Sequence, residues 1–169
     1  MNQMKEISIE KITLNMGTGG PGERLDKALR LLNKITSMKA VPTTTQKRIP
    51  TWDIRPGLQI GCKVTVRGKK AEELLGRLLK ASQDKILTIK FDKYGNFSFG
   101  VHEYIDIPGV QYDSSIGIIG FDVAVTLKRP GFRIKKRNIM KRKIPARHMI
   151  TKEEAIEFVK TKYEIGVNA

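Results

Sequence analysis

The stretch from Leu58 to Arg67 alternates strictly between apolar and polar positions, and this two-residue period constrains the fold more than any other feature of the sequence. The apolar positions are Leu58, Ile60, Cys62, Val64 and Val66, and the positions between them are Gln59, Gly61, Lys63, Thr65 and Arg67. Because successive side chains of a strand point to opposite faces of a sheet, the pattern predicts a β-strand that is buried on one face. The other face of this strand is polar and basic.

Two more segments alternate in the same way. Residues 11–16 have Ile12, Leu14 and Met16 on one side and Lys11, Thr13 and Asn15 on the other, and residues 121–127 repeat the pattern. Several strands with one wet face are typical of an antiparallel sheet that is covered on a single side.

The rest of the chain supplies helices and short strands. Apolar residues recur with a period of 3.6 over residues 22–38 and 69–83, which predicts two amphipathic helices. A capping box from Thr151 to Glu154 predicts a third helix, from 151 to about 162, with Ile156, Val159 and Tyr163 facing inward. We also expect an extended segment over 40–45 and strands over 86–91 and 97–101, on either side of the turn DKYGN. The fold class is therefore α+β, an open antiparallel sheet with helices packed on one face, in a single domain over residues 1–169.

The charge balance indicates a polyanionic partner. The sequence has 32 Lys and Arg against 17 Asp and Glu, a formal net charge of +15. Ten of these cations and no acid lie between Lys128 and Arg147, so much of the excess is concentrated in one segment. Phosphates relieve such repulsion and release counterions, which favours nucleic acid as the partner, with an anionic membrane surface as the rival.

Several classes of protein are disfavoured by what the sequence contains. Cys62 is its one cysteine, so neither an internal disulfide nor a cysteine-bound metal is expected. The amino terminus lacks the apolar core of a signal peptide, and no stretch approaches the length of a membrane span. We expect a cytosolic protein that uses no metal or other cofactor and makes no contact with a membrane.

The run Gly17–Gly22 matches the glycine spacing of a dinucleotide-binding turn, and this raises the alternative of a nucleotide-dependent enzyme. No acid for a ribose lies between Asp26 and Asp53, however, and no Lys-Ser or Lys-Thr follows the glycines. His102 and His148 are far apart and have no nucleophile signature near them. We interpret the glycines as a strand-to-helix turn and expect no enzymatic activity.

Three surfaces are candidates for contact with RNA. The polar face of the predicted sheet mixes amide, hydroxyl and cationic donors, which suits phosphates, 2′-hydroxyls and base edges of structured RNA. The loop 44–57 is predicted to protrude, with Lys47, Arg48, Trp52 and Arg55 near its tip, and Trp52 either packs on RNA or is buried. The basic segment 128–148 also contains Phe132, Ile134, Ile139, Met140 and Ile144, which favours a segment that docks on RNA over a solvated tail.

Over nearly its whole length the chain resembles ribosomal protein five of the large subunit, the family that binds 5S rRNA. The resemblance rests on the segments KITLNMGTG, KITSMKAVPTTTQKRI, IRPGLQIGCKVTVRG, FDKYGNFSFGVHEYIDIPGVQYD and IGIIGFDVAV, in the family's order and spacing. The chain begins almost at the first strand and has the basic segment before its last helix, which resembles the archaeal or eukaryotic type. The resemblance implies an open antiparallel sheet that binds 5S rRNA and bridges it to the large-subunit rRNA in the central protuberance, next to neighbouring ribosomal proteins and with a loop toward P-site tRNA.

The resemblance also implies roles for particular residues. The family's 5S contacts fall on Asn15, Thr65 and Arg67, which the alternation independently places on the polar face; Lys63 lies on the same face. A further family contact is a glutamine, but this chain has Met38 there, and Lys39 is the neighbouring residue that can reach a phosphate. The expected contacts of the large rRNA lie in the basic segment: Arg133, Lys135, Lys136, Arg137, Arg142 and Lys143. The competing hypothesis is a general nucleic-acid chaperone or ribosome assembly factor that acts through charge alone.

Overall fold

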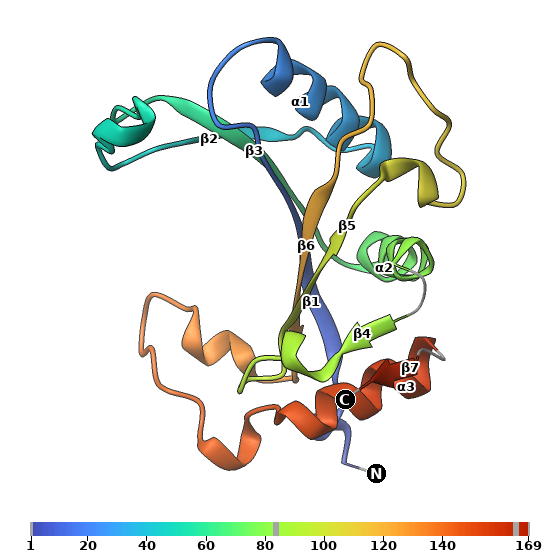
Figure 1. Cartoon of the computed structure of the whole chain (residues 1–169). Helices are drawn as coiled ribbons and strands as arrows, with labels where there is room; N and C mark the ends of the chain where they lie inside the picture. The colour runs from blue at the N-terminus through green and yellow to red at the C-terminus, as the bar shows by residue number, and fades with distance from the viewer. Residues whose placement is uncertain (1, 83–84, 164–165, 169) are drawn as a thin grey trace.

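The computed structural model describes residues 2–82, 85–163 and 166–168, and a twisted sheet of five antiparallel strands runs through it (Figure 1). The strand order is β2-β3-β1-β6-β5. The bounds are β1 (Ser8–Gly17), β2 (Val41–Thr44), β3 (Gln59–Val66), β5 (Phe97–Val101) and β6 (Phe121–Lys128). The sheet is open, with β2 and β5 at its edges, and the predicted α+β class is confirmed.

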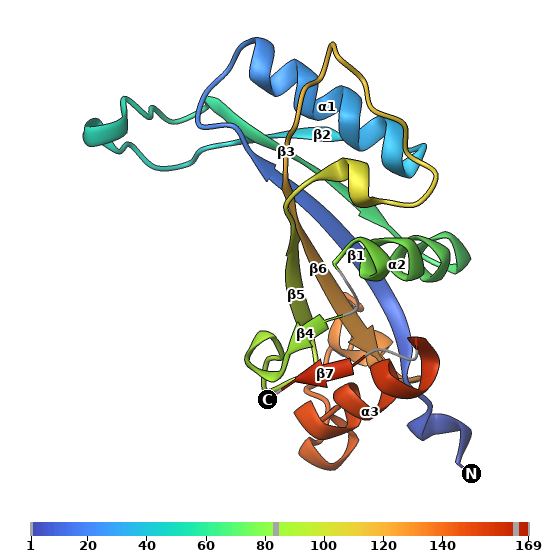
Figure 2. The same cartoon turned by 45° about the vertical axis from the view of Figure 1, so that its right-hand side comes forward.

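Two helices, α1 (Glu23–Thr36) and α2 (Lys69–Ala81), lie on the same face of the sheet (Figures 1 and 2). A third helix, α3 (Lys152–Tyr163), lies across the lower end of the sheet in Figure 1. The predicted helices 22–38 and 69–83 therefore exist with slightly shorter bounds, and Gln83 lies outside the described residues. The capping box is also confirmed, because the backbone N–H of Thr151 donates to a carboxylate oxygen of Glu154 at 2.9 Å.

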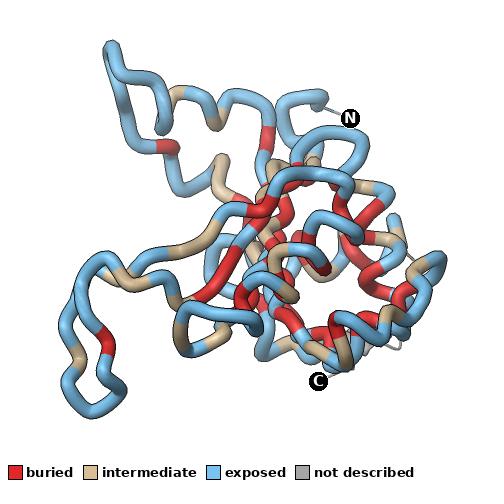
Figure 3. Tube along the Cα trace, turned by 90° about the horizontal axis from the view of Figure 1, so that it is seen from above, coloured by how far each residue is buried: buried red, intermediate tan, exposed pale blue. Residues whose placement is uncertain are grey.

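The core lies between the sheet and these helices (Figure 3). Ile12 and Leu14 of β1 and Leu75 and Leu78 of α2 are fully buried, as the two periodicities predict. Cys62 is buried with them, and burial raises the pKa of its thiol to about 11, so the side chain packs as a small apolar group. In α3 the inward face is formed by Ala155 and Val159, with Ile156 and Tyr163 only partly buried.

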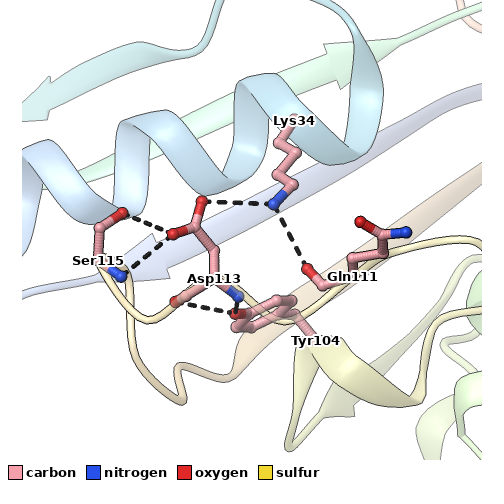
Figure 4. A network of polar contacts seen from close by, with 5 residues as sticks. All are labelled: Lys34, Tyr104, Gln111, Asp113 and Ser115. Atoms are coloured by element: carbon pink, nitrogen blue, oxygen red, sulfur yellow. Dashed lines mark hydrogen bonds and ion pairs between the residues drawn. The ribbon is translucent and has the colours of Figure 1, made fainter.

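The long connection between β5 and β6 is fixed to α1 by a polar network (Figure 4). The ammonium of Lys34 lies 3.4 Å from the carboxylate of Asp113, which also accepts hydrogen bonds from the hydroxyl and the N–H of Ser115. These bonds, the Ser115 hydroxyl first, lower the pKa of Asp113. The buried Tyr104 accepts a hydrogen bond from the Asp113 N–H at 2.9 Å.

The predicted strand over residues 86–91 is wrong for most of its length. Only β4 (Lys85–Leu87) is extended, and it pairs in parallel with β7 (Gly166–Asn168) instead of with β5. Thr88–Lys90 form a 3-10 turn that redirects the chain, so the expected hairpin is reduced to one bridge between Phe91 and Phe97. The apolar run was misleading because Ile89 is 81% exposed, whereas the ring of Phe91 stacks on Phe97 in the core.

A glycine in β3 is required by the close approach of its neighbours. A methyl group added at Gly61 would collide with the carbonyl oxygen of Met16 in β1 and would lie 3.2 Å from the hydroxyl of Thr43 in β2. We therefore expect Gly61→Ala to lower the free energy of unfolding by about 1–3 kcal/mol, the usual cost of overpacking. Urea denaturation measures this, and Gly20→Ala is the matched control because its added methyl meets no atom within 4 Å. Equal stability of the two variants would contradict the close packing of β1, β2 and β3.

Candidate nucleic-acid interface

Polar side chains of neighbouring strands lie side by side on the face of the sheet that α1 and α2 leave open. Across β1 and β3 the register pairs Thr13 with Thr65 and Asn15 with Lys63. Thr13 and Thr65 are half-buried, whereas Asn15 and Lys63 are exposed. Hydroxyl, amide and ammonium groups therefore form one surface. We call it the donor face and define it by Lys11, Thr13, Asn15, Lys39, Lys63, Thr65 and Arg67.

The predicted 5S contacts at the two sides of this surface are also exposed. Arg67 directly follows β3, two residues beyond Thr65, and its side chain is 60% exposed. Lys39 lies two residues before Val41, which pairs with Lys63. Ala40 between them is buried, and its N–H donates to the side chain of Asn33 at 2.7 Å, which fixes the backbone beside Lys39. Met38, at the position where the resemblance implies a glutamine contact, is 37% exposed.

A carboxylate that the sequence analysis missed lies among these cations. Glu10 forms ion pairs with Arg67, at 3.7 Å, and with Lys136 of the basic segment. Its side chain is only 11% exposed, and it sits where the register of β1 and β6 shifts between Ile9 and Lys11. The predicted strand began at Lys11, so alternation gave no signal for this residue. Glu10 joins the donor face to the basic segment.

Asp122 of β6 is a second acid on this surface. It pairs with Asn15 in the register of β1 and β6, and it is exposed. The alternation within residues 121–127 places Asp122 at a polar position, but only the strand order brings it beside Asn15. Most cations of the donor face thus lie toward β2 and β3, and Asp122 of β6 lies beside Asn15.

The loop 44–57 extends away from the sheet and has a structure of its own (Figures 1 and 3). Backbone hydrogen bonds of 2.9 and 3.1 Å join Ile49 to Ile54 around the 3-10 turn Pro50–Trp52. Ile54 is buried, whereas Trp52 is 70% exposed, which decides against the buried tryptophan. The cations of the loop are also exposed: Lys47, Arg48 and Arg55.

The basic segment 128–148 lies on the opposite side of the sheet from α1 and α2 (Figure 1). Of its apolar residues, Ile144 is buried and Phe132 and Ile134 are half-buried, while Ile139 and Met140 are 81% and 68% exposed. The basic segment therefore packs against the rest of the protein at its two ends, and its middle is exposed to solvent. The six predicted large-rRNA contacts are all exposed: Arg133, Lys135, Lys136, Arg137, Arg142 and Lys143.

Arg129 differs from the other cations of this segment because it is 4% exposed. Its guanidinium donates to the carboxylate of Glu154 at 2.7 Å and to the carbonyl of Met149 at 3.0 Å. It therefore anchors α3 and is unavailable to a phosphate.

The glycine run forms the turn between β1 and α1, as expected. Gly19 and Gly22 have φ of +79° and +126°, values that few other residues adopt. The first turn of α1 carries Glu23 and Asp26, which repel a phosphate, and the sheet beside it is antiparallel. His102 is exposed next to β5, and the ring of His148 packs edge-on against Phe132.

No helix among the described residues is both long enough and apolar enough to cross a membrane.

Comparison with known proteins assigns both parts of the chain to one family. Residues 2–55 match the family model of ribosomal protein L5, and residues 59–161 match the model of the C-terminus of the same ribosomal family. The chain is 48% identical to large ribosomal subunit protein uL5 of Sulfurisphaera tokodaii over 168 residues, which cover 99% of the chain and 95% of the relative. It is also 48% identical to uL5 of Nanoarchaeum equitans, covering 97% and 96%, and 45% identical to uL5 of Methanococcus aeolicus, covering 97% and 92%.

The pair of Arg129 and Glu154 generates a pH-dependent prediction. The pKa of Glu154 lies below its ordinary value of 4.5, chiefly because its carboxylate accepts the Thr151 N–H and also because Arg129 is beside it. A depressed pKa adds stability that is complete above pH 4.5 and is lost as the pH falls through the folded-state pKa. We expect Glu154→Gln to cost about 1–2 kcal/mol at pH 7, a value reduced for the exposure of this carboxylate.

Urea denaturation of the wild type and of Glu154→Gln at pH 7 and at pH 3 measures this difference, which should shrink at the lower pH. Glu157→Gln is the control, because Glu157 is an exposed carboxylate on the same helix. A difference that is constant with pH would show that the charge of Glu154 does not stabilise the fold.

Proposed function

The chain belongs to the ribosomal protein L5 family, and from this membership we propose that it is a structural component of the large ribosomal subunit that binds 5S rRNA. In this proposal it bridges 5S rRNA to the large-subunit rRNA in the central protuberance, contacts P-site tRNA and lies beside neighbouring ribosomal proteins. Its place in the cell is the ribosome in the cytoplasm. The family consists of ribosomal proteins and not of enzymes, so the nucleotide-dependent reaction is set aside.

The observation that carries the proposal is the register that brings Asn15, Lys63 and Thr65 together on one face, with Arg67 two residues beyond Thr65. An amide, an ammonium, a hydroxyl and a guanidinium together can bind phosphates, 2′-hydroxyls and base edges, which charge alone cannot discriminate. The strand positions of this face carry no aromatic ring in the described residues, so it suits structured RNA better than stacked single strands.

Two other surfaces take the remaining partners. The exposed cations of the basic segment suit the phosphates of the large rRNA. The segment lies on the same side of the sheet as the donor face but is not part of it, so one molecule can contact both RNAs. The exposed Trp52 and its neighbouring cations, at the tip of a loop that extends from the sheet, suit a contact with tRNA.

We further propose that residues 1–169 form one domain. The two family models divide the chain between Arg55 and Gln59, yet β1 from the first part pairs with β3 and β6 from the second. Neither part contains the whole sheet, so neither buries the apolar face of β1 by itself.

A general nucleic-acid chaperone remains the competing function, and the exposed cations of the basic segment are the observation in its favour. The two functions differ in selectivity. A chaperone that acts through charge binds RNAs of similar length about equally, whereas the donor face requires a particular arrangement of RNA groups.

We expect the protein to bind 5S rRNA more tightly than it binds tRNA or a random duplex of similar length at physiological salt. Asn15→Ala and Arg67→Ala should each weaken 5S binding by about 1–3 kcal/mol, because each removes a polar or charged contact of the donor face. Filter binding or fluorescence anisotropy measures these affinities. Equal affinities for all three RNAs would favour the chaperone, and folded variants with wild-type affinity would exclude the donor face.

The matched control is the double variant Arg48→Ala with Arg55→Ala, which removes exposed cations outside the donor face. It should retain 5S binding and lose affinity for tRNA or for the assembled subunit.

We expect the basic segment to bind the large rRNA separately from 5S rRNA. Changing its six exposed cations to Ala (Arg133, Lys135, Lys136, Arg137, Arg142 and Lys143) should flatten the salt dependence of large-rRNA binding by about 0.7–0.9 per lost phosphate contact. Binding of 5S rRNA should keep its selectivity. Salt titrations of both RNAs test this, and an unchanged slope on the large rRNA, or an equal loss on 5S rRNA, would show that the surfaces are not separable.

A further inference from the structure

A groove lies where the end of β6 meets the basic segment, and three of the proposed large-rRNA contacts, Lys135, Lys136 and Lys143, belong to its lining. It encloses about 290 Å³ and is lined from the sheet by Thr126 and Leu127 and from the basic segment by Phe132, Lys136 and Ile144. This volume is at the lower end of the ~300–1,000 Å³ typical of small-ligand sites. We call it the junction groove.

The walls of the junction groove are apolar and firmly held. Leu127 and Ile150 are 2% exposed and Ile144 is 8% exposed, so the walls belong to the packed interior. The ring of Phe132 is half-buried and packs edge-on against His148, with ring centroids 5.8 Å apart. A nitrogen of the His148 ring lies in turn 2.9 Å from the carbonyl oxygen of Pro130. The ring of Phe132 is thus held at the groove, and the exposed ring of Tyr94 also belongs to the groove lining.

The rim of the groove is charged. Lys135, Lys136 and Lys143 line it together with a single carboxylate, that of Glu10. The lysines are exposed, whereas the Glu10 side chain is 11% exposed and ion-paired with Lys136. Cations at the mouth attract phosphates, while the shielded carboxylate repels a phosphate and accepts hydrogen bonds from N–H groups such as the amino group of a base.

We propose that the junction groove binds one unstacked nucleobase of the bound RNA, with the neighbouring phosphates on the lysines of its rim. The inference rests on the proposed function, since the RNA must already lie on the donor face or the basic segment. A base fits each feature: a flat apolar body for Phe132 and Tyr94, N–H groups for Glu10, and a charged backbone for the lysines. The groove opens between two surfaces that both suit RNA, and Glu10 is the residue that joins them.

The first test locates the base. Wild-type protein bound to 5S rRNA, and separately to large-subunit rRNA, is irradiated with ultraviolet light, and the cross-linked peptides are sequenced by mass spectrometry. The expected adduct is a nucleotide on Phe132 or Tyr94. Adducts confined to Trp52 and to residues outside the groove would overturn the proposal.

The second test measures what the base contributes. An RNA that carries an abasic site at the cross-linked nucleotide should bind wild-type protein about tenfold more weakly, the scale of one base stacked on an aromatic ring. Phe132→Leu should bind both RNAs with the same, weakened affinity. Phe158→Leu is the matched control, because it also removes one partly buried ring but lies on α3, outside the groove lining, and it should retain the tenfold difference.

The outcomes separate the two proposals. If wild-type protein prefers 5S rRNA but binds the intact and the abasic RNA equally, the junction groove holds no base and the proposed function stands. If it shows no preference among RNAs, both proposals fail. The abasic RNA tests wild-type protein, so the result does not depend on the stability of Phe132→Leu, which thermal unfolding monitors separately.

Discussion

The register of β1 between β3 and β6 is the constraint on which the rest of the structure depends. Ile12 and Leu14 are fully buried, and the residues between and beyond them, Thr13 and Asn15, lie on the opposite face. Because side chains alternate, a slip of one residue would move the donor groups into the core and the apolar groups into water. The same strand register therefore determines both the burial of the core and the arrangement of the donor face. In these strands the hydrophobic effect that buries one face also fixes the positions of the polar side chains on the other face.

This coupling explains which parts of the site could be predicted from the sequence. Alternation depends on neighbouring residues, so Asn15, Lys63, Thr65 and Arg67 were assigned to the polar face without knowledge of the strand order. The partner of each strand depends on residues far away in the chain. The pairing of β4 with β7 joins segments about eighty residues apart, and nothing in the pattern of residues 86–91 indicates it. Asp122 was likewise placed on the right kind of strand position, but its neighbour Asn15 was known only from the sheet.

The charged residues show the same difference between what neighbouring residues indicate and what depends on residues far away in the chain. Ten cations between Lys128 and Arg147 predict a basic segment, but they do not say which of them face solvent. Arg129 is buried because its partner Glu154 is supplied by the first turn of α3, 25 residues later. A guanidinium that leaves water requires such a partner, since an uncompensated buried charge costs several kcal/mol. The cations without such a role stay at the surface, and these are the groups that an RNA can reach.

Glu10 shows how a single acid organises a basic surface. Its ion pair with Arg67 joins a carboxylate that is 11% exposed to a guanidinium that is 60% exposed. A pair of this kind in contact with water contributes about 1 kcal/mol or less, so Arg67 can exchange the carboxylate for a phosphate at little cost. Glu10 cannot make the reverse exchange, because a carboxylate repels the same phosphate. In the proposed complex, the carboxylate would keep the RNA backbone on the two sides of the junction groove, over the donor face and the basic segment, and would leave the groove between them to a group that donates hydrogen bonds.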